Sequence, residues 1–146
     1  AMADYANENG VLCCHENEKG IYGDIPERCL EIAEYFGDRL GCIFDPANYI
    51  QTGSDTKKGF DALCGYITYM HIKDTMAADG SVVPAGEGDG NLEYIITKLD
   101  EYEKPFILSV EPHLKVFDGL AALDGDLDEV IDGLITADQA ERMKNF

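Results

Sequence analysis

The sequence predicts an α/β fold built on a parallel sheet, and three observations lead to this prediction. Short apolar runs of strand length recur along the chain, segments with helical spacing lie between them, and a polar loop that often contains glycine follows each run. The predicted strands are residues 11–15, 41–44, 67–72 and 106–110. Four strand–loop–helix units in series favour parallel strands joined by right-handed crossovers.

The helices between the strands are predicted from the spacing of their apolar residues. Residues 25–36 carry apolar side chains at helical intervals, with Asp24 and Glu27 placed as a capping pair. Residues 92–99 predict a second helix that ends before Pro105. A weaker pattern at residues 60–67 runs into the following strand, and residues 127–134 predict the last helix. We expect the residues before Gly10 to be the end of an earlier helix.

Composition bounds the class of protein. A chain of 146 residues with 45% hydrophobic and 27% charged residues can form one domain with a core of its own. The net charge of −18, from 29 acidic against 11 basic residues, opposes binding to nucleic acid and to anionic membranes. No apolar run approaches the roughly 18–20 residues that a membrane span needs. The first residues do not resemble a signal peptide, and the five cysteines form no CxxC pair, so we expect a cytoplasmic protein with reduced cysteines.

Each predicted strand ends in a side chain that can bind a metal ion. These side chains are Glu16, Asp45, His71 and Glu111. One such residue alone is more commonly a helix cap or a packing residue, but the ends of parallel strands meet at one edge of the sheet, where four of them can converge. Three carboxylates and one imidazole suit a catalytic divalent ion better than a structural zinc ion.

The residues around these strand ends resemble the signatures of a known superfamily. The segments CHEN (14–17), FDPAN (44–48), YMHIKD (69–74) and SVEPH (109–113) are similar to motifs of xylose-isomerase-like proteins. These include sugar phosphate isomerases and epimerases, ketose 3-epimerases and apurinic endonucleases. The loop at 83–90 resembles the Gly-x-Gly loop that follows their seventh strand. The resemblance covers nearly the whole chain and aligns it with strands five to eight of the family barrel.

The resemblance implies a fold, a site and a reaction. Residues 1–146 would form the C-terminal half of a (β/α)₈ TIM barrel, completed by self-association as a homodimer or by a missing N-terminal half. Glu16, Asp45, His71 and Glu111 would hold a divalent metal ion (Mn, Mg, Co or Zn), with Glu16 and Glu111 also acting as catalytic acid and base. The implied activity is that of an isomerase or epimerase, which moves a proton on a sugar or sugar phosphate through an enediolate.

The chain also departs from the pattern of ketose 3-epimerases. Asn48 stands where they carry a histidine, and no arginine follows His71 shortly afterwards. The substrate therefore stays open, and Asn17, Asn48 and Lys73 are the polar residues best placed to bind it, although each is equally plausible as a loop hydrogen bonder.

Two other functions are weighed against this one. A non-catalytic or truncated half-barrel could bind a metal ion or a partner without turnover. An apurinic endonuclease would need more histidines than His15, His71 and His113, and a less acidic surface.

Two glycine- and acid-containing loops suggest ligands that we do not expect. Residues 83–90 could be mistaken for a phosphate cradle, but Glu87 and Asp89 disfavour a bound anion, so turn geometry, a helix start near Gly90 or loop closure is expected there. The run at residues 124–128 imitates a calcium loop, but it lacks the glycine and the terminal glutamate of an EF-hand. A solvated helix start is expected at this position.

Overall fold

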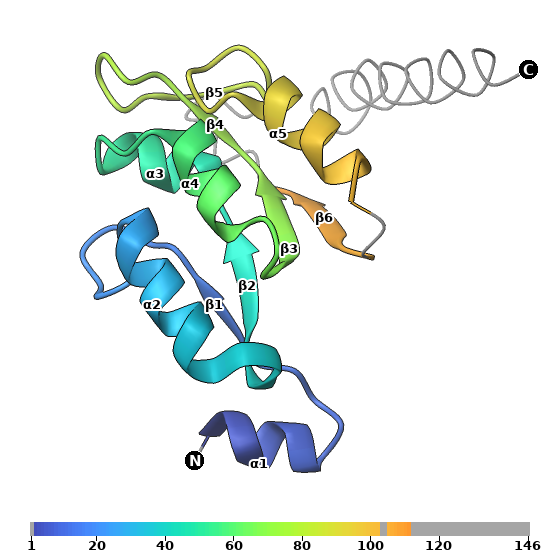
Figure 1. The fold of residues 1–146 in the computed structure, drawn as a ribbon. Helices are drawn as coiled ribbons and strands as arrows, with labels where there is room; N and C mark the ends of the chain where they lie inside the picture. Colours follow the sequence, from blue (N-terminus) through green and yellow to red (C-terminus); the bar gives the residue numbers. More distant parts are fainter. Residues whose placement is uncertain (1, 103–104, 112–146) are drawn as a thin grey trace, which may run out of the picture. The chain divides into compact units, whose positions relative to one another are not determined.

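The fold was analysed in a computed structural model, which describes residues 2–102 and 105–111 (Figure 1). Helices and strands alternate along most of this part of the chain. The helices are α1 (Met2–Glu8), α2 (Pro26–Phe36), the short 3₁₀ helix η1 (Gly37–Arg39), α3 (Pro46–Gln51), α4 (Thr56–Leu63) and α5 (Leu92–Asp100). The strands are β1 (Cys14–Glu16), β2 (Gly41–Phe44), β3 (Ile67–Ile72), β4 (Asp74–Thr75), β5 (Val82–Val83) and β6 (Ile107–Val110).

Four of these strands form one parallel sheet, as the sequence predicts. Its order is β1-β2-β3-β6, and each neighbouring pair is parallel. The register places Glu16 beside Ile43 and His71 beside Ser109, so the C-terminal ends of the strands lie at one edge. This α/β architecture with a four-stranded parallel sheet is consistent with part of a TIM barrel. The strands β4 and β5 form a separate antiparallel pair just beyond β3.

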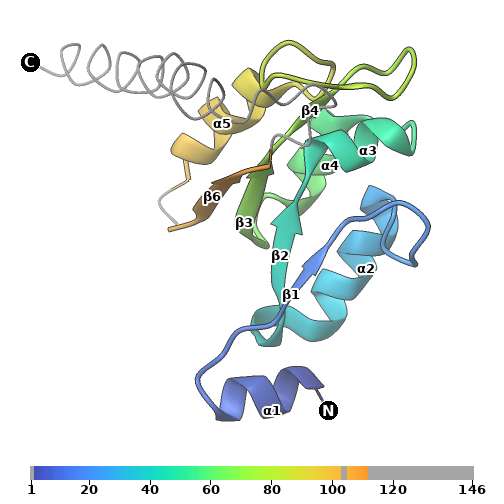
Figure 2. The ribbon, with the colours of Figure 1, turned by 180° about the vertical axis from the view of Figure 1, so that it is seen from behind.

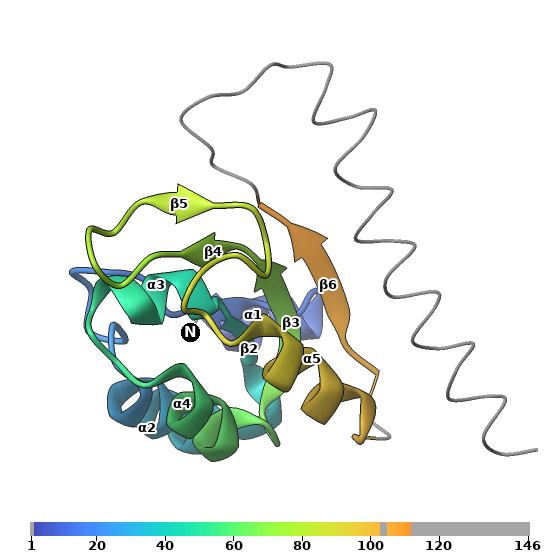
Figure 3. The same cartoon turned by 90° about the horizontal axis from the view of Figure 1, so that it is seen from above.

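The core lies between one face of the sheet and helices α2, α4 and α5 (Figures 2 and 3). Phe44 and Met70 extend from the sheet into this layer, and Phe60, Leu63 and Ile95 meet them from the helices; all five are at most 1% exposed. Fully burying a side chain of this size contributes about 1.5–3 kcal/mol. The helix-covered face therefore supplies the rigid support for the strand ends.

The opposite face of the sheet is less covered. Its side chains include Cys14, which is exposed, and Ile43 and Tyr69, which are half-buried. Ile107 on β6 is 59% exposed. A parallel sheet normally buries both of its faces. This face carries apolar side chains such as Ile43 and Ile107 that are incompletely packed within the described residues.

Several elements differ from the sequence predictions. Strand β1 begins at Cys14 rather than at residue 11, and Val11 and Leu12 before it are exposed. The proposed capping pair is wrong: Ile25 is the N-cap of α2 and makes no side-chain cap, while the Asp24 carboxylate pairs with Arg28 at 2.7 Å.

Helix α3 and the β4–β5 pair were not predicted. The loop that contains Asp45 turns directly into α3, because Pro46 suits the first helical position and Asp45 caps it. The helix predicted before Gly10 is present as α1. The helix predicted at 127–134 and the loop at 124–128 lie outside the described residues. No helix that the structure describes is both long and apolar enough to cross a bilayer.

Candidate metal centre

The four side chains predicted at the strand ends lie together in the structure. The potential ligand atoms of Glu16, Asp45, His71 and Glu111 are all within 4.8 Å of one another. The Nδ1 atom of His71 is 3.0 Å from Glu16 Oε1, 3.6 Å from Asp45 Oδ2 and 3.4 Å from Glu111 Oε2. The convergence that parallel topology predicts is therefore confirmed.

The sheet order distributes these residues in a regular way. Asp45 and His71 come from the two inner strands, β2 and β3, and are 0% and 7% exposed. Glu16 and Glu111 come from the two outer strands, β1 and β6, and each side chain is 31% exposed. The inner pair is thus rigidly enclosed, and the two glutamates face the site from opposite sides with partial access to solvent.

The donor set fits a divalent cation. The buried Nδ1 atom of His71 has three carboxylate oxygens around it but makes no hydrogen bond within the described part of the chain. A buried polar atom without a partner is costly, and a ligand that supplies the partner removes this cost. Carboxylate oxygens with an imidazole nitrogen are suitable ligands for a divalent ion such as Mn²⁺, Mg²⁺ or Zn²⁺.

Asp45 is held by two different groups. Its Oδ1 atom accepts the backbone N–H of Asn48 at 3.0 Å, which caps helix α3. Its Oδ2 atom lies 2.7 Å from Lys73 Nζ, and this ammonium group is also 3.7 Å from Glu111 Oε2. Burial opposes the charge on Lys73, but the hydrogen bond and charge of Asp45, with the charges of Glu111 and Glu16, outweigh it and raise the pKa of the ammonium group.

Asn17 and Asn48 connect the ends of β1 and β2. Asn17 Oδ1 accepts the N–H of Asp45 and Asn17 Nδ2 donates to the Asp45 carbonyl oxygen, both at 2.8 Å. Asn48 Nδ2 donates to the carbonyl oxygen of Asn17 at 2.9 Å and lies 3.4 Å from Glu16 Oε1. Both asparagines are buried, and the hydrogen bonds just described give their polar groups partners within the protein.

The environment of Glu16 raises the pKa of its carboxyl group. Burial is the largest cause that raises the pKa of its carboxyl group, and the charges of Asp45 and Glu111 act in the same direction. The charges of His71 and Lys73 oppose this shift without cancelling it. A carboxyl group with a raised pKa can exchange a proton nearer to neutral pH than an ordinary glutamate.

Asp74 is the residue near this site that sequence reasoning missed. It lies one residue after Lys73 and is 1% exposed. Its side chain contacts the glycine loop at residues 86–90 rather than the four candidate ligands. The available signal was the period of two along HIKD, which places His71 and Lys73 on one side and Asp74 on the other.

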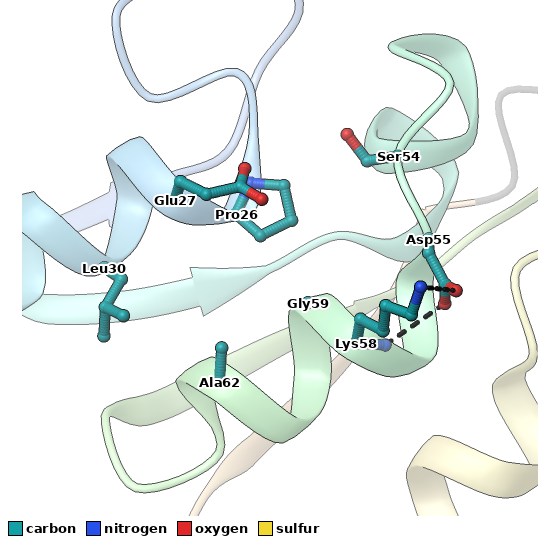
Figure 4. A pocket seen from close by; sticks show the side chains of 8 residues that line it. All are labelled: Pro26, Glu27, Leu30, Ser54, Asp55, Lys58, Gly59 and Ala62. Atoms are coloured by element: carbon teal, nitrogen blue, oxygen red, sulfur yellow. Dashed lines mark hydrogen bonds and ion pairs between the residues drawn. The ribbon is translucent and has the colours of Figure 1, made fainter.

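A separate groove of about 320 Å³ lies between α2 and α4 (Figure 4). It is lined by Pro26, Leu30, Gly59 and Ala62, with Lys58 and Asp55 paired with each other at its rim. None of the four candidate ligands lines it. The groove lies between helices that cover the sheet, away from the strand ends that carry the titratable cluster.

The fold and the site together define an α/β protein whose four-stranded parallel sheet is consistent with part of a TIM barrel and carries a candidate divalent-metal centre at its C-terminal strand ends. The chain belongs to the xylose isomerase-like TIM barrel family, whose model matches residues 1–132. A search of curated protein sequences found no match.

Solved structures with a similar fold carry several different activities. The probable 3-DHS dehydratase AsbF of Bacillus anthracis matches 75% of this chain and 46% of its own, with a TM-score of 0.65 and 20% identity. A D-tagatose 3-epimerase-like protein matches 91% of this chain and 53% of its own, with a TM-score of 0.61 and 23% identity. The 3-keto-D-glucoside 4-epimerase YcjR of E. coli matches 90% and 49%, with a TM-score of 0.67 and 12% identity. The chain thus spans about half the length of these structures.

Proposed function

We propose that this protein is a divalent-metal-dependent isomerase or epimerase that acts on a sugar or sugar phosphate by proton transfer through an enediolate. The observation that carries the proposal is the cluster in which Glu16 and Glu111 face His71 Nδ1 from the two outer strands. Two carboxylates on opposite sides of one point can serve as acid and base on the two faces of a substrate. The names of two similar structures, both of which are described in terms of sugar epimerases, support the substrate class.

The proposed chemistry assigns one task to each group. Glu16, Asp45, His71 and Glu111 would hold a divalent ion, which when bound would stabilise the negative charge that develops on the substrate oxygens. Glu16 takes the proton from the carbon beside the carbonyl group, and the electron pair of the broken C–H bond moves into the enediolate. Glu111 gives a proton to the carbon that is to be reprotonated. The raised pKa of Glu16 suits a group that must both accept and release a proton.

Three further residues belong to the proposed site. Lys73 has its ammonium group 2.7 Å from Asp45 Oδ2 and is a candidate to contact a substrate oxygen once a metal ion shares that carboxylate. Asn48 lies 3.4 Å from Glu16 Oε1 and would orient this carboxylate toward the substrate. Asn17 is proposed as a substrate-binding residue too, although its side chain is bonded to the backbone of Asp45.

We also propose that this chain is the C-terminal half of a barrel and that a complete site needs the other half. A (β/α)₈ barrel takes about 250 residues. Within residues 2–102 and 105–111, one face of the sheet is less covered and the outer strands β1 and β6 each have one neighbouring strand, so a further element could pair with each outer edge. We propose that a second copy of the chain or an N-terminal half completes the barrel. Sedimentation equilibrium of the chain at micromolar concentration tests this proposal, since a stable monomer contradicts completion by a second copy. Addition of an upstream half, where one is encoded, should then displace any self-association and raise activity.

A screen of ketoses, aldoses and their phosphates with added Mn²⁺ in D₂O tests the reaction. Turnover should place solvent deuterium at the reacting carbon, and Glu16→Gln and Glu111→Gln should each abolish turnover. Glu93→Gln, on the exposed surface of α5, is the matched control and should leave it unchanged. Turnover without deuterium would contradict proton transfer. Metal binding without turnover in the completed barrel would favour the alternative function, a half-barrel that binds a metal ion or a partner.

A further inference from the structure

The buried carboxylate of Asp74 is surrounded by backbone N–H groups. Its Oδ2 atom accepts the N–H groups of Gly86 and Gly88, both at 3.0 Å, and its Oδ1 atom accepts that of Gly90 at 2.8 Å. The N–H of Thr75 also donates to Oδ1, at 2.9 Å. Within the described residues, no lysine or arginine forms an ion pair with Asp74. Backbone dipoles therefore hold this charge.

The loop between β5 and α5 is shaped around this carboxylate. Alternate residues Gly86, Gly88 and Gly90 direct their N–H groups to it, which is the concave arrangement that binds anions in proteins. A Cβ atom at Gly88 would overlap the Asp74 carboxylate, and one at Gly90 would lie 2.7 Å from Oδ1. Gly86 also adopts a φ of 92°, which a residue with a side chain rarely adopts. These three positions therefore require glycine.

The same loop packs beside the start of α3, next to the candidate ligand Asp45. Figures 1 and 3 show the loop from β5 to α5 alongside α3 and β4. A Cβ atom at Gly90 would lie 3.4 Å from Pro46 Cβ, and the N–H of Asp89 donates to the carbonyl oxygen of Thr75 at 3.0 Å. Asp74 follows strand β3, which carries His71, and its carboxylate binds the loop at residues 86–90. This loop packs against Pro46, the residue after Asp45.

We propose that Asp74 is a positioning residue of the candidate site, which acts as an internal anion that holds the loop at residues 86–90 against the start of α3. The loop amides are occupied by this carboxylate, so they do not bind a substrate phosphate, and Glu87 and Asp89 beside them repel one. A phosphorylated substrate would need its phosphate held elsewhere. The effect of Asp74 on metal binding through Asp45 rests on the proposed function. The contact between Asp74 and the loop does not depend on it.

The test replaces the internal anion with an external one. Asp74→Gly removes the carboxylate, and formate or acetate can then occupy the vacated position. We expect cleavage by Glu-C protease after Glu87, identified by mass spectrometry, to become at least about 10-fold faster in the variant. Mn²⁺ affinity should fall by about 10–100-fold, as for other residues that position metal ligands. Formate should reverse both effects with a saturable concentration dependence.

A control in the same loop separates this role from a general loss of stability. Asp89→Asn removes a carboxylate that accepts the N–H of Ala77 at 2.7 Å on the exposed side of the loop. Formate should change neither its cleavage rate nor its Mn²⁺ affinity. An Asp74→Gly variant that is cleaved like the parent, or that formate does not restore, overturns the proposal.

Measurements on the parent chain keep the proposal testable if the variant does not fold. The amide protons of Gly86, Gly88 and Gly90 should exchange with solvent at least about 100-fold more slowly than exposed loop amides, and inorganic phosphate should not shift their NMR signals. Fast exchange of all three, or saturable shifts with phosphate, would overturn it. A parent chain that binds no Mn²⁺ would contradict the proposed function alone, because protease cleavage and amide exchange still test the contact between Asp74 and the loop.

Discussion

The ammonium group of Lys73 lies 2.7 Å from Oδ2 of Asp45, and both side chains are almost completely buried, at 6% and 0% exposure. Neither charge could be left alone in this position, because an uncompensated charge in the interior is strongly unfavourable. The pair therefore balances part of the negative charge that three carboxylates bring to the site. The Asp45 carboxylate thus has three neighbours: Lys73, His71 and the backbone N–H at the start of α3.

Removal of the lysine should destabilise the metal-free protein. We expect Lys73→Met to lower the free energy of unfolding by about 3–5 kcal/mol, since Asp45 would be left buried and unpaired. The stabilisation is present at neutral pH, because a raised lysine pKa means that it is lost only as the pH rises through that raised value. Urea denaturation of the chelated protein measures the change.

An exposed ion pair provides the control for this measurement. Lys58 lies 3.7 Å from Asp55 with 86% of its side chain exposed, so Lys58→Met should cost no more than about 1 kcal/mol. Mn²⁺ should stabilise Lys73→Met more than it stabilises the parent, because the added cation supplies charge next to Asp45. Equal effects of the two lysine substitutions would show that the buried pair does not have the role described.

The second prediction concerns His71, the imidazole among the candidate ligands. His71→Ala should weaken Mn²⁺ binding by roughly 100-fold or more, which exceeds the usual effect of residues that only support a ligand. Isothermal titration calorimetry of the chelated protein measures this affinity. His15→Gln is the control: the His15 ring packs beside Gly23, away from the cluster, so this variant should bind Mn²⁺ as the parent does. Parent-like binding by His71→Ala would contradict the assignment.

Metal binding should weaken in acid. A carboxylate must lose its proton before it can bind a metal ion, and burial raises the pKa of Glu16 above its usual value. Affinity should therefore fall as the pH falls through this raised pKa. A series of Mn²⁺ titrations from pH 7.5 downward measures this dependence, and loss of affinity only below the pKa of an ordinary glutamate would contradict the prediction.

The raised pKa of Glu16 also affects the stability of the metal-free protein. A carboxyl group with a raised pKa in the folded state contributes stability below its unfolded pKa, and this contribution is lost as the pH rises through the folded pKa. Glu16→Gln should thus make the metal-free protein more stable than the parent at neutral pH while it weakens Mn²⁺ binding. Thermal unfolding at several pH values, with and without Mn²⁺, tests both effects; a less stable metal-free variant at neutral pH would refute the first.

The fifth prediction concerns the link between β1 and β2. Asn17→Ala would remove both side-chain hydrogen bonds to the buried backbone of Asp45, which we expect to cost about 2–4 kcal/mol of stability. Urea denaturation measures this loss. Asn7→Ala is the control, because Asn7 also makes two side-chain hydrogen bonds to the backbone, both as the donor, but lies in an exposed position. Equal losses in the two variants would show that the link to Asp45 adds no stability beyond that of a surface hydrogen bond.

Much of the fold and the convergence of the candidate ligands could be predicted from local pattern. The runs at β2, β3 and β6 consist mainly of apolar residues, so their strand character and their order along the chain are readable from the sequence. The ligand set follows from topology, since residues at the ends of successive parallel strands must approach one another. Helix α3 was missed because Pro46 and its neighbours show only one turn and a half of helical pattern.

The sequence by itself determined that four strands form a parallel sheet and that Glu16, Asp45, His71 and Glu111 lie at its C-terminal edge, because both follow from periodicity and chain direction. Only the tertiary structure decided where the remaining polar groups are directed. It paired Lys73 with Asp45 and filled the glycine loop with Asp74 rather than leaving it open to an anion. Asp45 and Lys73 are 28 positions apart in the sequence, and Asp74 and Gly90 are 16 positions apart. Burial and hydrogen-bond satisfaction select such partners, and no local pattern encodes them.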